Sequence, residues 1–216
     1  RNITLGESAS RLIASQGALV SRVNYQGDVG LHVAKALYGI KILNIDISKS
    51  GKLKPSDKAE ILGEAYTACS KAYEEKDEAK TQINKINKQI YSRDKDILSL
   101  WATTRQWSLE YFEFIYKRVG TSFERLFFES EVYESGKQIV LDNVGKVFEK
   151  NEGAIIFAGK KYGTHTRVFV TGEGNPTYEG KEMGLGPLEY KEFKFDQALH
   201  VVGPEQSGYF EVVFKA

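Results

Sequence analysis

The residues VSRVNYQGDVG, at positions 20–30, decide the fold class of this 216-residue chain. The β-branched residues that lead to Tyr25 predict a short strand, and the two glycines after it permit a sharp turn at the carboxyl end of that strand. Apolar residues at helical spacing precede this stretch at 5–19 and follow it at 31–42. A helix, a strand, a glycine loop and a second helix in this order are typical of an α/β sheet.

The loop after this strand is a candidate binding site, because ligands of open α/β sheets bind at the carboxyl ends of the strands. Its polar residues Asn24, Gln26 and Asp28 are the candidates to line such a site. The loop matches neither the glycine fingerprint of dinucleotide-binding proteins nor a P-loop. The sequence therefore argues against a nicotinamide-dependent enzyme and against a P-loop enzyme.

The stretch 51–120 differs from its surroundings because its pattern is helical and mostly polar. One long helix is predicted after Pro55, and Asp94 can cap a second that runs to about residue 119. We therefore expect a helical insertion at 51–120 that separates the first part of an α/β core, residues 1–50, from its second part, residues 121–216.

The second part of the core alternates predicted strands with helices. The strands are expected at 125–129, 154–157, 167–170 and 197–202. The last of these is a continuous apolar run, which predicts a strand buried on both faces. Thr177 can cap a helix that starts at Tyr178, and a last helix is predicted to begin near Gln206.

Composition and charge exclude several classes of protein. The formal net charge of +1 does not by itself demand nucleic acid as a partner. The single cysteine, Cys69, excludes an internal disulfide and indicates a reducing compartment, so we expect a cytoplasmic protein. No apolar run is long enough to span a membrane, and the scattered histidines lack metal-ligand spacing, so neither a membrane span nor a metal site is expected.

Tyr178 and Glu182 are candidates for a cation-binding pocket, because residues four apart share one face of a helix. Gln206 follows the predicted strand at 197–202. If these elements are neighbours, a phenol, a carboxylate and an amide converge in a set that suits a planar guanidinium group. The spacing alone leaves open the alternative of a surface glutamate and a packed tyrosine.

Five segments carry a family resemblance that covers nearly the whole chain. In order they are RNITLGES at 1–8, VNYQGDVG at 23–30, FFESE at 127–131, PTYEGKE at 176–182 and VVGPEQ at 201–206. They resemble segments of the arginyl-tRNA synthetases, which are class I aminoacyl-tRNA synthetases. The resemblance implies a Rossmann-like parallel sheet of the class I catalytic core, incomplete in this chain, with a helical insertion.

The resemblance also implies a function and a set of roles. Such enzymes activate L-arginine with ATP and Mg²⁺ and transfer it to tRNA(Arg). The arginine guanidinium would be bound by Tyr178, Glu182 and Gln206, although the family usually has aspartate at the position of Glu182. The residues Asn24, Gln26 and Asp28 would lie at a strand end near the active site. No bound cofactor is expected in the chain itself.

The catalytic signature motifs of the family do not occur in this sequence. By the resemblance, the His-x-Gly-His signature would precede Arg1, and the Lys-Met-Ser-Lys-Ser type loop would follow Ala216. Both ends also fall within helical patterns, so the chain looks like an internal fragment of the catalytic domain. The side chains of these two motifs supply the donors that stabilise the adenylyl group while it is transferred, so the reaction needs both motifs in place. We therefore expect the fragment alone to lack activity.

Two other kinds of function stay open at the level of sequence. A synthetase-like module without catalytic activity would keep an amino-acid pocket and serve in recognition or interaction. A helical interaction protein would bind a partner through the aromatic stripe that contains Trp101 and Trp107. We interpret those two residues as helix packing instead.

Overall fold

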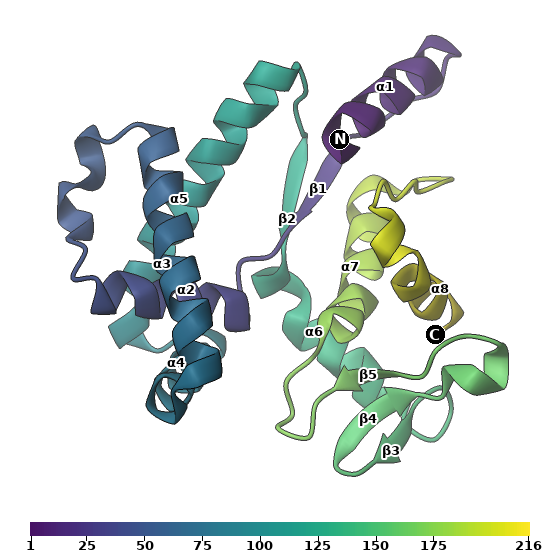
Figure 1. Ribbon diagram of the computed structural model, residues 1–216. Helices are drawn as coiled ribbons and strands as arrows, with labels where there is room; N and C mark the ends of the chain where they lie inside the picture. Colours follow the sequence, from purple (N-terminus) through teal and green to yellow (C-terminus); the bar gives the residue numbers. More distant parts are fainter. The chain divides into compact units, whose positions relative to one another are not determined.

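The computed structural model describes residues 1–216, except for the side chains of residues 49 and 50. The chain forms two compact units: residues 1–26 together with 123–216, and residues 27–122 (Figure 1). The second unit therefore begins within the glycine loop, whereas the sequence predicts that the core continues to residue 50.

The first unit combines a parallel strand pair, a small antiparallel sheet and helices. Its elements are α1 (Asn2–Ser15), β1 (Val23–Gln26), β2 (Arg125–Phe128), α6 (Glu129–Asp142), β3 (Glu149–Asn151), β4 (Ala154–Phe157), η2 (Gly159–Tyr162), β5 (Arg167–Val170), α7 (Tyr178–Phe193), η3 (Pro204–Gln206) and α8 (Ser207–Lys215). Strands β3, β4 and β5 pair antiparallel in that order.

Strands β1 and β2 confirm the predicted α/β class. They pair in parallel, with Val23 opposite Arg125 and Gln26 opposite Phe128. Parallel neighbours cannot be joined by a tight turn, so the chain must cross over between them. Here the whole helical unit 27–122 forms that connection. The loop at the end of β1 is therefore where the helical unit leaves the core.

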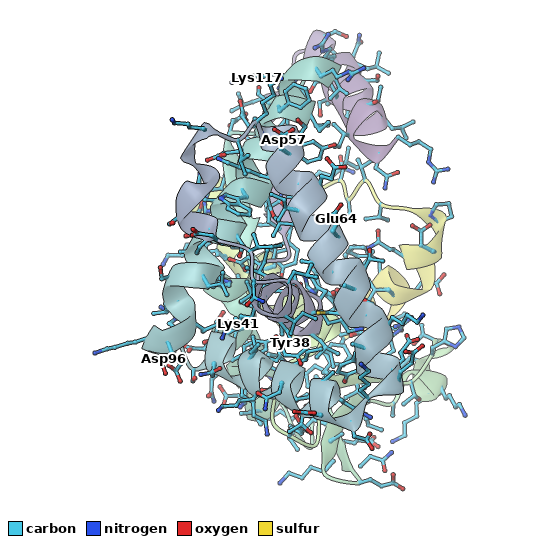
Figure 2. The ribbon with its side chains drawn as sticks, turned by 60° about the vertical axis from the view of Figure 1, so that its left-hand side comes forward. Tyr38, Lys41, Asp57, Glu64, Asp96 and Lys117 are labelled. Carbon is cyan, nitrogen blue, oxygen red and sulfur yellow. The ribbon has the colours of Figure 1, made fainter. Side chains whose placement is uncertain are left out.

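The second unit is a bundle of helices that contains both the helices expected within 51–120 and the helix expected at 31–42. Its elements are α2 (Leu31–Ile42), η1 (Ile47–Lys52), α3 (Pro55–Glu75), α4 (Asp77–Tyr91) and α5 (Lys95–Val119). Leu37, Cys69 and Ile83 are fully buried in its core. Charged side chains such as Lys41 and Glu64 lie exposed on its outside (Figure 2).

Helix α5 confirms the capping and packing predicted for it. The Asp94 carboxylate accepts a hydrogen bond from the backbone N–H of Asp96 at 2.9 Å, which satisfies a free donor of the first turn. Trp107 is only 3% exposed, and Trp101 donates its indole N–H to the carbonyl oxygen of Asp28 at 2.7 Å. Both tryptophans are therefore part of the packing within this unit. No helix of the described residues is long and apolar enough to cross a membrane.

The prediction of a buried strand at 197–202 is wrong. Leu199 is 61% exposed and Val201 is 41% exposed, and the segment belongs to no sheet of the described residues. A strand buried on both faces needs ladder partners and covering layers. The apolar run has the composition of such a strand, but the parallel sheet described here contains only β1 and β2.

Helices α6 and α7 approach closely because glycines line their contact. A Cβ added at Gly184 would lie 2.5 Å from the carbonyl oxygen of Val132, and one at Gly136 would lie 2.2 Å from that of Gly180. Real Cβ atoms essentially never come this close to a backbone oxygen. The backbones can therefore touch only where the side chain is a hydrogen atom.

We predict that Gly184→Ala destabilises the first unit by roughly 1–3 kcal/mol, because the added methyl group overpacks a backbone contact. Gly63→Ala is the matched control, since Gly63 lies in an exposed helix with nothing within 4 Å of its added Cβ. That control is expected to be neutral or to stabilise by up to about 1 kcal/mol. Urea unfolding followed by circular dichroism measures both, and equal effects of the two substitutions would contradict the close contact.

Candidate functional site

The first turn of α7 is fixed to strand β5. The Thr177 hydroxyl donates to the carbonyl oxygen of Val168 at 2.7 Å and accepts from the backbone N–H of Gly180 at 3.4 Å. This confirms Thr177 as the N-cap. Tyr178 and Glu182 follow one helical turn apart, so they lie on the same side of a firmly placed helix end.

A buried ion pair joins the start of α6 to the start of α7. The Lys181 ammonium donates to a Glu129 carboxylate oxygen at 2.7 Å, and the two residues are only 4% and 2% exposed. Desolvating both charges is costly, and the pair persists only because each charge has its partner. Glu129 directly follows β2, so this pair ties the end of the parallel strand pair to α7.

A second ion pair joins α7 to β5. An Arg167 terminal nitrogen donates to a Glu179 carboxylate oxygen at 2.9 Å, and Glu179 is 8% exposed. The Arg167 guanidinium also lies 5.9 Å from the centroid of the Tyr209 ring, where the ring's negative face attracts a cation. The carboxylate of Glu179 is therefore already neutralised by the protein.

The third carboxylate at this end of α7, Glu182, lies in a different environment. The nearby Tyr209 hydroxyl, which comes from α8, acts to lower the pKa of Glu182, but less strongly than burial acts to raise it. Burial raises the pKa of Glu182 to about 7, and the nearby carboxylates of Glu189, Glu129 and Glu179 add to that rise. The same environment, burial first, holds the pKa of Tyr209 well above its usual range, so the phenol stays protonated.

The first turn of α7 thus gathers three carboxylates and two protein cations. Lys181 pairs with Glu129 and Arg167 pairs with Glu179, while Glu182 has no ion pair among the described side chains. One negative charge is left without a cationic partner among the described side chains. Within that described part of the chain, no three His, Cys, Asp or Glu side chains are grouped so that they could hold a metal ion.

The predicted guanidinium-binding residues are partly brought together. Tyr178 is 56% exposed, and the Lys181 ammonium lies 5.1 Å from the centroid of its ring. Gln206 is exposed at the start of α8, where its amide oxygen accepts from the backbone N–H of Gly203 at 3.3 Å. The residue of α8 that influences the pKa of Glu182 is Tyr209, which lies almost one turn beyond Gln206.

The strand-end residues occupy two different units. Asn24 and Gln26 are half-buried in β1, opposite Leu126 and Phe128 of β2. Asp28 belongs to the helical unit, is 6% exposed, and accepts from the Arg105 guanidinium at 2.9 Å. That ion pair fixes the loop to α5.

Five residues of this site are not among those that the sequence predicts. They are Glu129, Arg167, Glu179, Lys181 and Tyr209. Lys181 had a local signal, because it lies four residues before Leu185 and therefore shares a helix face with an apolar residue. The other pairings join elements distant in sequence and had no local signal.

The chain matches one family model over all of residues 1–216, described as tRNA synthetases class I (R), catalytic domain. It is 29% identical to the arginine–tRNA ligase of Borrelia garinii subsp. bavariensis over 223 residues, covering 99% of this chain and 38% of the relative. It is also 29% identical to that of Treponema denticola, covering 99% and 37%. The chain therefore spans less than two-fifths of the length of these relatives.

Solved structures support the same fold. The crystal structure of arginyl-tRNA synthetase from Plasmodium falciparum matches with a TM-score of 0.72 at 20% identity, over 99% of this chain and 35% of that one. The putative arginyl-tRNA synthetase of Campylobacter jejuni matches with a TM-score of 0.61 at 16% identity, over 98% and 45%. At these identities the likeness shows the fold alone.

We predict that Lys181→Met destabilises the first unit by about 3–5 kcal/mol, because Glu129 is left as an uncompensated buried charge. The double variant Lys181→Met with Glu129→Gln is expected to recover most of that loss. Lys191→Met, on the exposed side of α7, is the control and should stay within about 0.5 kcal/mol of the parent chain. Denaturant unfolding measures all three, and an unaffected Lys181→Met would refute the pair.

We predict that Glu182→Gln stabilises the chain at pH 8 but not at pH 4. The unfolded chain releases the glutamate proton near the ordinary pKa of about 4.3, whereas the folded chain retains it up to about 7. The folded state therefore loses stability as the pH rises between those two values, and glutamine removes this loss. Melting temperatures across pH 4–8 measure the effect. The exposed Glu211→Gln on α8 is the control, and a constant difference over pH would contradict the prediction.

Proposed function

Because this chain belongs to the class I tRNA synthetase (R) catalytic-domain family, which its whole length matches, we propose that it forms the L-arginine-binding part of an arginine–tRNA ligase. The guanidinium group of the amino acid would bind at the first turn of α7. The complete enzyme would activate L-arginine with ATP and Mg²⁺ and transfer it to tRNA(Arg).

The observation that carries this proposal is the state of Glu182. Its two neighbouring carboxylates, on Glu129 and Glu179, are each paired with a protein cation, whereas the groups that shift the pKa of Glu182 include no cation. Burial without a cation makes the ionised form unfavourable, which is why its pKa is raised. A guanidinium ligand supplies the missing charge and two parallel donors that match a carboxylate.

The surrounding residues have roles that follow from their placement. Tyr178, one turn before Glu182 on α7, offers a ring face and a hydroxyl to a planar cation. Gln206 would contribute an amide from the start of α8. We assign Asn24 and Gln26 to the wall at the end of β1, and we assign Asp28 the positioning of the loop through its pair with Arg105.

ATP, Mg²⁺ and tRNA(Arg) are proposed as partners only because this chain belongs to the synthetase family. We assign no residue of this chain to ATP, Mg²⁺ or tRNA, because the family's catalytic signatures do not occur in its sequence. We expect the isolated polypeptide to bind L-arginine without forming arginyl-adenylate. A cytoplasmic location fits a chain whose single cysteine, Cys69, is buried and unpaired with another cysteine.

We predict that the 216-residue chain binds L-arginine in a calorimetric titration and that Glu182→Gln weakens this binding roughly 10- to 100-fold, the effect of a hydrogen bond to a charged group. Binding should strengthen as the pH rises through about 7, because the ionised Glu182 is the form that pairs with guanidinium. L-Citrulline, which has the shape but lacks the charge, is the matched ligand control and L-lysine the second.

The controls separate this proposal from its alternatives. Equal binding of citrulline and arginine would rule out charge recognition by Glu182. Pyrophosphate exchange dependent on arginine, measured on the same preparation, is expected to stay at background. Arginine binding by a longer chain that also lacks exchange would favour a non-catalytic amino-acid-binding module. Unchanged affinity in Glu182→Gln would refute the assignment of this pocket.

A further inference from the structure

Two lysine side chains from different helices gather at one tyrosine ring in the helical unit. The Lys35 ammonium of α2 lies 4.5 Å from the centroid of the Tyr73 ring of α3, and the Lys80 ammonium of α4 lies 6.0 Å from the same centroid. Helix α2 packs against both α3 and α4 (Figure 1). Because the negative face of an aromatic ring attracts cations, this ring holds two positive charges close together.

The Tyr73 ring is a fixed platform, because it packs against the buried core of this unit. That core contains Leu37 of α2, Cys69 of α3 and Ile83 of α4, all fully buried. Cys69 lies about one turn before Tyr73 on the same helix face, and Ile83 lies about one turn after Lys80. The backbones that carry the ring and Lys80 are therefore held by core packing, whereas the lysine stems are long and flexible.

The two ammonium groups at this ring have no acidic partner. By contrast, the Lys71 ammonium, also on α3, lies 4.0 Å from the Glu75 carboxylate. Among the described side chains, no carboxylate lies within ion-pair distance of Lys35 or Lys80. Two like charges repel each other, and the ring attracts each cation without cancelling its charge. A bound anion would therefore stabilise this arrangement.

A phosphate group is the anion that fits this set of donors. Its oxygens point in tetrahedral directions, so cations that approach from different helices can share them, whereas the two oxygens of a carboxylate lie in one plane. The Tyr73 hydroxyl makes no hydrogen bond to another described residue, so it is available as a third donor. We propose that Lys35, Tyr73 and Lys80 form a binding site for a phosphate group, either a free anion or a phosphodiester of a nucleic-acid backbone. This site lies within residues 27–122 and does not rest on the arginine pocket proposed at α7.

The first measurement is a titration of the 216-residue chain with inorganic phosphate, exchanged for chloride at constant ionic strength. Carbon–proton NMR follows the lysine ε-methylene groups, and the signals of Lys35 and Lys80 are assigned by their loss in Lys35→Gln and Lys80→Gln. We expect saturable shifts of both signals. Lys71, which is exposed and paired with Glu75 on α3, is the internal control and should shift little.

Substitutions test whether the two charges act together. Lys35→Gln and Lys80→Gln are each expected to weaken phosphate binding roughly two- to fivefold, the effect of one exposed charge pair, and the double variant should lose saturable binding. Lys80→Arg keeps the charge and should keep most of the affinity. Lys71→Gln removes the same charge from a paired position and should leave the affinity unchanged. Circular dichroism verifies the helices, and if the double variant unfolds, the exposed Lys80→Gln alone decides.

Fluorescence anisotropy with a labelled oligouridylate distinguishes the two sources of phosphate. Oligouridylate binding that weakens in the double variant but not in Lys71→Gln assigns the site to a nucleic-acid backbone. Phosphate binding without such an effect on oligouridylate assigns it to a free anion. Equal shifts of the Lys35, Lys71 and Lys80 signals would show general screening by salt and overturn the site, and so would parental affinity of the double variant for both ligands.

Discussion

The close approach of α6 and α7 is the constraint on which the site depends. Glycines at 136 and 184 let the two backbones touch where any Cβ would clash with the facing helix. This contact sets α7 beside the start of α6, and the Lys181 ammonium reaches the Glu129 carboxylate only from that distance. Close packing thus determines an electrostatic pair, and the pair in turn fixes the helix end that carries Tyr178 and Glu182.

The charges at this helix end follow one physical rule, that a buried carboxylate must find a partner. Two of them meet it with a full cation, which makes Glu129 and Glu179 part of the framework. Glu182 has no ion pair among the described side chains, and the cost of ionising it shows in its raised pKa. Without a ligand the ionised form of such a carboxylate is unfavourable, and a bound cation would stabilise it. This is the property expected of a binding residue.

Local features of the sequence were sufficient to predict the elements but not the contacts. The Asp94 and Thr177 caps, the helix at 31–42 and the strands at β1, β2, β4 and β5 were all predicted, because caps, periodicity and β-branched runs act over a few residues. The prediction of a strand at 197–202 was wrong because it depended on contacts that a short stretch of sequence does not determine. An apolar run has the composition for burial, whereas burial itself depends on partners that lie elsewhere. The placement of Arg167, Lys181 and Tyr209 around the helix end depends in the same way on the packing of whole elements.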